Sequence, residues 1–161
     1  YALENNFDML LLDATGALGS PWSELKSAPD LAILRDAVSI LRELDREEEI
    51  DLVYFGGLRS GTDAAKVIGL GGKAVVYGVV AALAAGGQIT DTHDMHFEAD
   101  RTSDDRSEGV SAILKACANE ASMMARCTGK TNLMNIEPED MRAISVATSQ
   151  ATGVPVAGNT E

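Results

Sequence analysis

Three short apolar runs separated by helix-like segments constrain the fold of this chain more than any other feature of its sequence. The runs lie at residues 8–13, 50–55 and 73–77, and the first is apolar at successive positions. Continuous apolar strands are typical of parallel sheets that are covered on both faces. The order strand, helix, strand, helix, strand, helix predicts right-handed parallel βαβ units and therefore an α/β fold.

Helices are expected after each of these strands. Residues 29–44 carry apolar side chains three and four positions apart, which is the pattern of an amphipathic helix with one buried face. A second helix is expected over residues 62–70, and a third, built of small residues, from Gly78 through Ala85. Each follows a strand and its connecting turn, as βαβ units require.

The second half of the chain has a different pattern. Residues 89–102 are polar and show neither a helical nor a strand period, which predicts a loop. A long helix is expected to begin at Ser103, as its N-terminal cap, and to end near Cys127. Pro138 suits the first turn of a final helix that runs to about Ala151.

Composition excludes some classes of function. A formal net charge of −12 does not suit a phosphate backbone, which is bound by clustered Lys and Arg, so nucleic acid is not an expected partner. No apolar run approaches the ~20 residues of a membrane span, so no membrane association is expected. Cys117 and Cys127 are too far apart along one expected helix to form a disulfide, and unpaired thiols fit a reducing, cytoplasmic setting.

Glycine-rich turns follow the second and third apolar runs. The first opens with Gly56 and Gly57, and the second with Gly78 and Val79. Glycine lets the backbone approach a ligand closely, and free amides at a helix start favour an anion, so these four residues predict a phosphate site built of backbone amides. Arg59 would add a charged hydrogen bond. In (β/α)8 barrels the loops after the last two strands form the usual phosphate site.

A simpler explanation exists for each of these features. Glycines at strand ends often only permit a turn, and an exposed Arg59 would pair with Asp63 rather than with a ligand. His93 and His96 lie near several carboxylates, but two histidines in a polar loop are more often solvated than metal-bound. The sequence therefore predicts no metal site.

The length of the chain bears on the size of the fold. With 161 residues it can bury one core, but it is shorter than the roughly 250 residues of a complete (β/α)8 barrel. It begins at Tyr1 without a methionine and enters an apolar strand by Phe7, so we interpret it as part of a longer barrel.

Two stretches resemble the FMN-binding glutamate synthase family. Residues 55–87, which begin FGGLRSG, are similar to the last two strand units of FMN-dependent barrels. Residues 124–158, which contain ARCTGKTN and EPEDMRA, resemble the C-terminal extension of the glutamate synthase FMN domain and of methylglutamate synthase subunits. The resemblance implies the C-terminal portion of a (β/α)8 TIM barrel over residues 1–87 and a helical C-terminal extension, after a polar loop, over residues 88–161.

The same resemblance implies a function for the intact protein. It implies FMN as cofactor and the reductive amination of 2-oxoglutarate to glutamate, with an amine donor as the second substrate. Most substrate and flavin contacts would come from strands that this chain lacks, so no catalytic residue is assigned. The missing half of the barrel, or a second chain, is an expected partner because a partial barrel leaves strand edges uncovered.

The chain departs from the family pattern at two places. The family's glycine-rich GGTG loop is replaced between Asp13 and Pro21 by DATGALGSP. No cysteine occurs between Gly78 and Ala116, and an iron–sulfur cluster needs three or four thiolates, so no cluster is expected in this chain. These departures leave two alternatives: a half-barrel scaffold without catalysis, or a phosphate-binding barrel without flavin chemistry.

Overall fold

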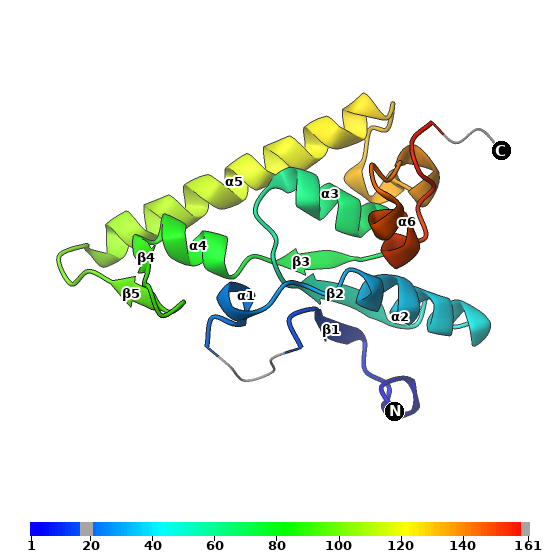
Figure 1. Ribbon diagram of the computed structural model, residues 1–161, viewed down its shortest axis with the longest axis horizontal. Coiled ribbons are helices and arrows are strands. Elements are labelled where there is room, and N and C mark those ends of the chain that lie inside the picture. Colours follow the sequence, from blue (N-terminus) through cyan, green and yellow to red (C-terminus); the bar gives the residue numbers. More distant parts are fainter. Residues whose placement is uncertain (17–20, 159–161) are drawn as a thin grey trace.

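The centre of the computed structural model, which describes residues 1–16 and 21–158, is a three-stranded parallel sheet. Strand β1 (Met9–Asp13) pairs with β2 (Asp51–Phe55), and β2 pairs with β3 (Ala74–Val76). All three predicted strands are therefore confirmed, in parallel order and adjacent to one another (Figure 1). The parallel arrangement brings the carboxyl ends of all three strands to one edge of the sheet.

One face of the sheet carries the main core. Leu12, Leu52 and Tyr54 point to this face and pack against Leu34 of α2 and Val67 of α3, all of them buried. The predicted helices are present as α2 (Ala32–Glu43), α3 (Gly61–Gly69) and α4 (Val79–Ala84). The three-and-four spacing of apolar residues in α2 buries one side of that helix, as expected.

The opposite face of the sheet is open along its two edge strands, while Val53 of the central strand β2 is buried. Met9 and Leu11 of β1 are 59% and 53% exposed, and Val76 of β3 is 39% exposed. A run of apolar side chains on an unpaired edge strand is unusual for a protein surface, because such edges invite pairing with another chain. Within the described part of the chain, these side chains are covered only in part.

Helix α5 (Ser103–Cys127) runs along α3 and α4, across the top of Figure 1. It crosses both helices closely: a Cβ on Gly61 would lie 2.0 Å from the Cys117 carbonyl oxygen, and one on Gly109 would lie 2.1 Å from that of Ala84. The predicted helix is confirmed, but Thr102 is its cap in place of Ser103. The Thr102 hydroxyl accepts from the Asp105 amide, and the two side chains form a capping box.

The polar segment before α5 contains a β-hairpin that the sequence analysis missed. Strands β4 (Gly87–Ile89) and β5 (Met95–Phe97) pair in antiparallel fashion. Each has three residues and most of their side chains are exposed, so no apolar alternation marks them in the sequence.

Of the helix expected from Pro138 to about Ala151, only the second half is present. Pro138–Asp140 forms only a 3-10 turn, as Leu133–Asn135 does before it, and α6 spans Val146–Thr152. The chain between turn and helix is extended because Ala143 exchanges backbone hydrogen bonds with Pro155 and Ala157. A tertiary backbone contact therefore overrides the local helical pattern.

Two further short elements complete the fold. A 3-10 turn spans Leu3–Asn5, and the four-residue helix α1 (Ser23–Lys26) lies between β1 and α2 in sequence. The altered loop from Asp13 to Pro21 falls partly outside the described residues. Among the described helices, none is both long and apolar enough to cross a membrane.

Candidate functional site

The turn after β2 depends on its two glycines. Gly56 and Gly57 have φ angles of 137° and 69°, which lie in a region that favours glycine. Space is also limited, since a Cβ on Gly56 would lie 3.0 Å from the Ala14 Cβ and one on Gly57 would lie 2.8 Å from Pro29 Cγ. These glycines hold the turn tightly against the loops that follow β1.

Two backbone amides from neighbouring turns converge at the carboxyl edge of the sheet. The amide of Gly57 donates to Glu24 Oε1 at 2.8 Å, and the amide of Val79 donates to Glu24 Oε2 at 2.8 Å. We call this pair of amides, Gly57 and Val79, the amide cup. Its convergence on one anion matches the geometry expected from the sequence, but the anion is the carboxylate of Glu24.

Gly78 makes room for this carboxylate. A Cβ at Gly78 would lie 2.0 Å from Glu24 Oε2 and 2.9 Å from the Phe55 ring. Of the four residues expected to supply amides, Gly57 and Val79 do so in this structure, while Gly56 and Gly78 provide conformation and space.

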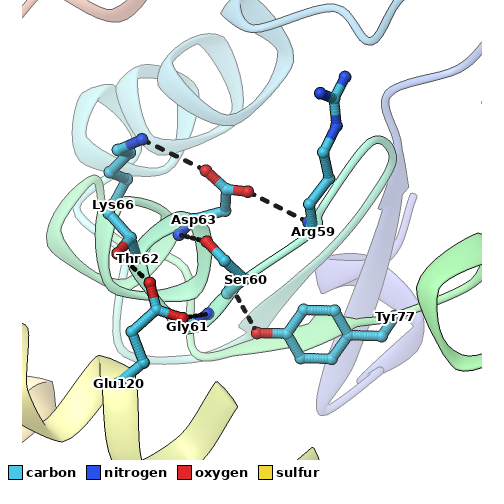
Figure 2. Close-up of polar contacts among 8 residues, drawn as sticks. All are labelled: Arg59, Ser60, Gly61, Thr62, Asp63, Lys66, Tyr77 and Glu120. Carbon is cyan, nitrogen blue, oxygen red and sulfur yellow. Dashed lines mark hydrogen bonds and ion pairs between the residues drawn. The ribbon is translucent and has the colours of Figure 1, made fainter. Parts of the chain in front are cut away.

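A second carboxylate binds amides one turn further along the chain. Glu120 of α5 accepts from the Gly61 amide at 2.9 Å and from the Thr62 hydroxyl at 2.5 Å, at the start of α3 (Figure 2). The hydrogen bond from Thr62, followed by that from the Gly61 amide, lowers the pKa of Glu120 below its ordinary value. Glu120 thus binds the first amide of α3 as a carboxylate, next to the N-cap residue Ser60, whose hydroxyl accepts from the Asp63 amide.

Arg59 lies between these two amide sites in sequence, and its side chain is exposed. Its backbone amide donates to Asp63 Oδ2 at 3.1 Å, and the ion pair of Asp63 is with Lys66 at 3.2 Å. The Arg59 guanidinium forms no hydrogen bond or ion pair with the described residues, and Figure 2 shows it pointing away from Asp63. The alternative of an Arg59–Asp63 side-chain pair is therefore wrong.

Tyr77 ties the end of the third strand to the start of α3. Its hydroxyl donates to the Ser60 carbonyl oxygen at 2.9 Å (Figure 2). Burial, and secondarily the neighbouring Cys117 side chain, raises the pKa of Tyr77 above its ordinary value, so the phenol stays protonated and keeps donating. This bond fixes the turn that carries Arg59 relative to Gly78.

A pocket of about 550 Å³ lies beside the amide cup. It is lined by Gly56 and Gly57 of the turn, by Leu34 of α2 and Val67 of α3, and by residues of the C-terminal segment, including Ile144. Arg59, Gly78 and Val79 are not among its lining residues. The pocket therefore meets the expected phosphate site only at Gly56 and Gly57.

The histidines and cysteines form no ligand cluster. His93 and His96 are exposed at the β4–β5 hairpin, and the described residues contain no group of three metal-binding side chains. Cys117 is buried and Cys127 is exposed, both as free thiols.

The sequence analysis missed both carboxylates. Glu24 lies 33 residues before Gly57 and 55 before Val79, and Glu120 lies 59 residues after Gly61. No local pattern links residues at such separations. The glycine turns were the only available signal, since they indicate where free amides lie but not which group binds them.

The chain matches known proteins in sequence and in fold. Residues 4–95 match the family described as the conserved region in glutamate synthase. A glutamate synthase large subunit-like protein from Rhizobium meliloti (strain 1021) is 32% identical over 189 aligned positions, which cover 98% of this chain and 43% of the relative. The chain thus spans less than half the length of that relative.

Solved structures of a flavocytochrome b2 variant share the fold. The form with pyruvate bound superposes with a TM-score of 0.65 over 99% of this chain and 34% of the other, at 20% identity. The form with sulfite bound gives a TM-score of 0.65 over 97% of this chain, at 21% identity.

Proposed function

This chain belongs to the glutamate synthase family, and we propose that it is the C-terminal portion of a (β/α)8 barrel that binds FMN through the phosphate end of the cofactor. The single observation that carries this proposal is the amide cup, because the amides of Gly57 and Val79 converge on one anion at the carboxyl edge of a parallel sheet. Loops at that edge, after the last two strands of such barrels, are the usual phosphate site.

The residues present fit a phosphate group. The two carboxylate oxygens of Glu24 stand in for two phosphate oxygens, each at 2.8 Å from an amide nitrogen. Gly78 leaves space at this point, and the free guanidinium of Arg59 is a charged donor without a partner among the described residues. We therefore assign phosphate binding to Gly57, Val79 and Arg59, with Gly56 and Gly78 shaping the turns.

In the intact protein, bound flavin would supply the hydride that reduces the imine of ammonia and 2-oxoglutarate to glutamate. The residues of this chain would anchor and orient the cofactor at that step. Groups that contact 2-oxoglutarate or transfer protons would come from the other portion of the barrel, so no residue here is given a catalytic role.

That other portion would also cover the open side of the sheet. The exposed apolar residues of β1 and β3 are the places where further barrel strands would pair and pack. In this proposal, residues 1–87 form the barrel units and residues 88–161 the extension, and the missing part lies elsewhere in the same protein or in a companion chain.

A second candidate function is a half-barrel scaffold that binds no flavin. One observation favours it: Glu24 already satisfies both amides of the cup, so the fold needs no ligand there. The visible absorption spectrum of the purified intact protein separates the two, because only a flavoprotein shows flavin bands after gel filtration.

The test of the phosphate site is a titration of FMN into the intact protein and two variants. Gly78→Val places a branched side chain in the cup and should abolish tight binding. Arg59→Ala should weaken binding roughly ten- to hundredfold, the equivalent of the about 1.5–3 kcal/mol that a charged hydrogen bond contributes, without changing the thermal midpoint. Arg126→Ala, an exposed arginine on α5, is the matched control. Unchanged FMN affinity in both site variants would refute the proposed phosphate site.

A further inference from the structure

One carboxylate occupies the place that the proposed function gives to a phosphate. Glu24 accepts from both cup amides at 2.8 Å. Gly78 has no side chain that would clash with the Glu24 carboxylate. A phosphate and a carboxylate cannot share two single-proton donors, and like charges repel at such short range. A phosphate ligand therefore enters only if Glu24 leaves.

The element that carries Glu24 is short and is attached at its ends. Helix α1 has four residues, of which only Ser23 is fully buried. At one end the Trp22 ring packs on Phe97 of β5 with centroids 6.1 Å apart, and at the other Lys26 pairs with Asp94 of the hairpin at 3.4 Å. Glu24 lies between these two contacts. We call residues 22–26 the strap and its contacts with the β4–β5 hairpin the clamp.

The clamp is made of surface contacts. The side chains of Lys26 and Asp94 are 37% and 52% exposed, and ion pairs of this kind hold weakly against water. Phe97 is itself exposed, with the Arg106 guanidinium 5.4 Å from its ring centre. Releasing the strap disrupts these exposed contacts and exposes Ser23, the one buried residue of α1, but it leaves the buried face of the sheet intact.

We propose that Glu24 is an internal competitor for the phosphate of the ligand, and that the strap acts as a gate which must release before that phosphate binds. This inference rests on the proposed function for the identity of the ligand, while the contact itself is a property of the fold. The two amides exchange one anion for another, so the cost of opening is the loss of the clamp and of the burial of Ser23. Ligands without a phosphate do not compete with Glu24.

The experiment compares Glu24→Gln with wild type in the intact protein, by calorimetric titration of FMN, riboflavin and inorganic phosphate. Glutamine keeps the shape of glutamate but offers one acceptor and no charge, so it holds the two amides less well. We expect the affinity for FMN to rise at least tenfold and that for riboflavin to stay unchanged. Inorganic phosphate should bind measurably only to the variant. Glu43→Gln, an exposed glutamate on α2, is the control and should behave as wild type.

The outcomes separate this inference from the proposed function. Equal FMN affinity in wild type and Glu24→Gln overturns the gate and leaves the flavin site standing. Weaker FMN binding by a folded Glu24→Gln also overturns it, because Glu24 would then brace the site. If FMN binds neither protein but inorganic phosphate binds only the variant, the gate holds and the flavin proposal fails. If no ligand binds either protein, both ideas fail.

A second variant tests the gate without altering the cup. Lys26→Met removes the ion pair of the clamp while Glu24, Gly57 and Val79 stay in place. We expect FMN affinity to rise by a few-fold, in the same direction as in Glu24→Gln but by less. An affinity equal to or below that of wild type would show that the clamp does not restrain the strap.

Discussion

Glu24 and Glu120 perform the same chemistry in two regions of the molecule that are supported very differently. Each carboxylate accepts a backbone amide at a glycine turn that follows β2, from Gly57 in one case and from Gly61 in the other. Glu120 belongs to the 25-residue helix α5, which packs on α3 and α4. Glu24 belongs to a four-residue helix that reaches the hairpin through exposed side chains.

This difference shows that the stability of a hydrogen bond to a backbone amide depends on how firmly the element that carries the acceptor is packed. Displacing Glu120 would require α5 to move away from α3, against a backbone approach so close that Gly61 admits no Cβ. Displacing Glu24 requires only a short strap to leave the surface. We therefore regard the Glu120 contact as part of the fold and the Glu24 contact as exchangeable.

The largest expected effect comes from adding a methyl group at each contact. Gly61→Ala would place its Cβ 2.0 Å from the Cys117 backbone oxygen, so a helix must shift, and we expect a loss of about 2–4 kcal/mol in the free energy of unfolding. Gly78→Ala would place its Cβ 2.0 Å from the end of the Glu24 side chain and 2.9 Å from the Phe55 ring, but the short strap that carries Glu24 can release, so the loss should be smaller, about 1–2 kcal/mol. Urea denaturation of both variants checks this, and equal losses would contradict the comparison.

A smaller effect is expected from neutralising each carboxylate. Glu120→Gln should lower the thermal midpoint by several degrees, because the first amide of α3 loses a charged acceptor and the Thr62 hydroxyl loses its strongest acceptor. Glu24→Gln should lower it by less, since solvent replaces the carboxylate at the cup. Scanning calorimetry of both variants at neutral pH provides the measurement. A larger fall for Glu24→Gln would reverse the assignment of the two roles.

The pH dependence of stability should follow Glu120. Its pKa is lowered in the folded state, so folding disfavours its protonation, and its stabilising contribution is present above the unfolded pKa and lost as pH falls through the folded pKa. The difference in thermal midpoint between wild type and Glu120→Gln should therefore be largest at neutral pH and should fall toward zero as the pH is lowered. Asp105 and Asp140 also have lowered pKa values but are present in both proteins, so they cancel in this difference. A difference that does not change with pH would refute the prediction.

The smallest effect on stability is expected at the clamp. Asp94→Asn removes the ion pair with Lys26, which is exposed, so the free energy of unfolding should change by less than about 0.5 kcal/mol. The same variant should loosen the strap, as faster hydrogen exchange at the Gly57 and Val79 amides would show. Exchange at the Gly61 amide, which Glu120 protects, should stay unchanged and serves as the internal control.

The elements that the sequence predicted correctly are those marked by a local pattern. The three strands lie in apolar runs, α2 has apolar residues three and four positions apart, α3 and α4 follow a strand and its glycine turn, and α5 begins with capping residues. The hairpin strands have three residues each and mostly exposed side chains, so they carry no such pattern. The sequence predicts a helix before α6 because its local pattern is helical. The structure is extended there because Ala143 pairs with residues near Pro155, which local sequence does not show.

The sequence by itself determined where the chain turns and where free amides lie, because glycine positions and apolar spacing act within a few residues. It also indicated the family, through the motifs within residues 55–87 and 124–158. Only the tertiary structure decided which groups meet those amides. Glu24 and Glu120 come from 33 to 59 residues away, and several carboxylates of this acidic chain are chemically equal to them. Their selection follows from the packing of α1 and α5 around the sheet, since a hydrogen bond depends on distance in space and the sequence encodes that distance only through the whole fold.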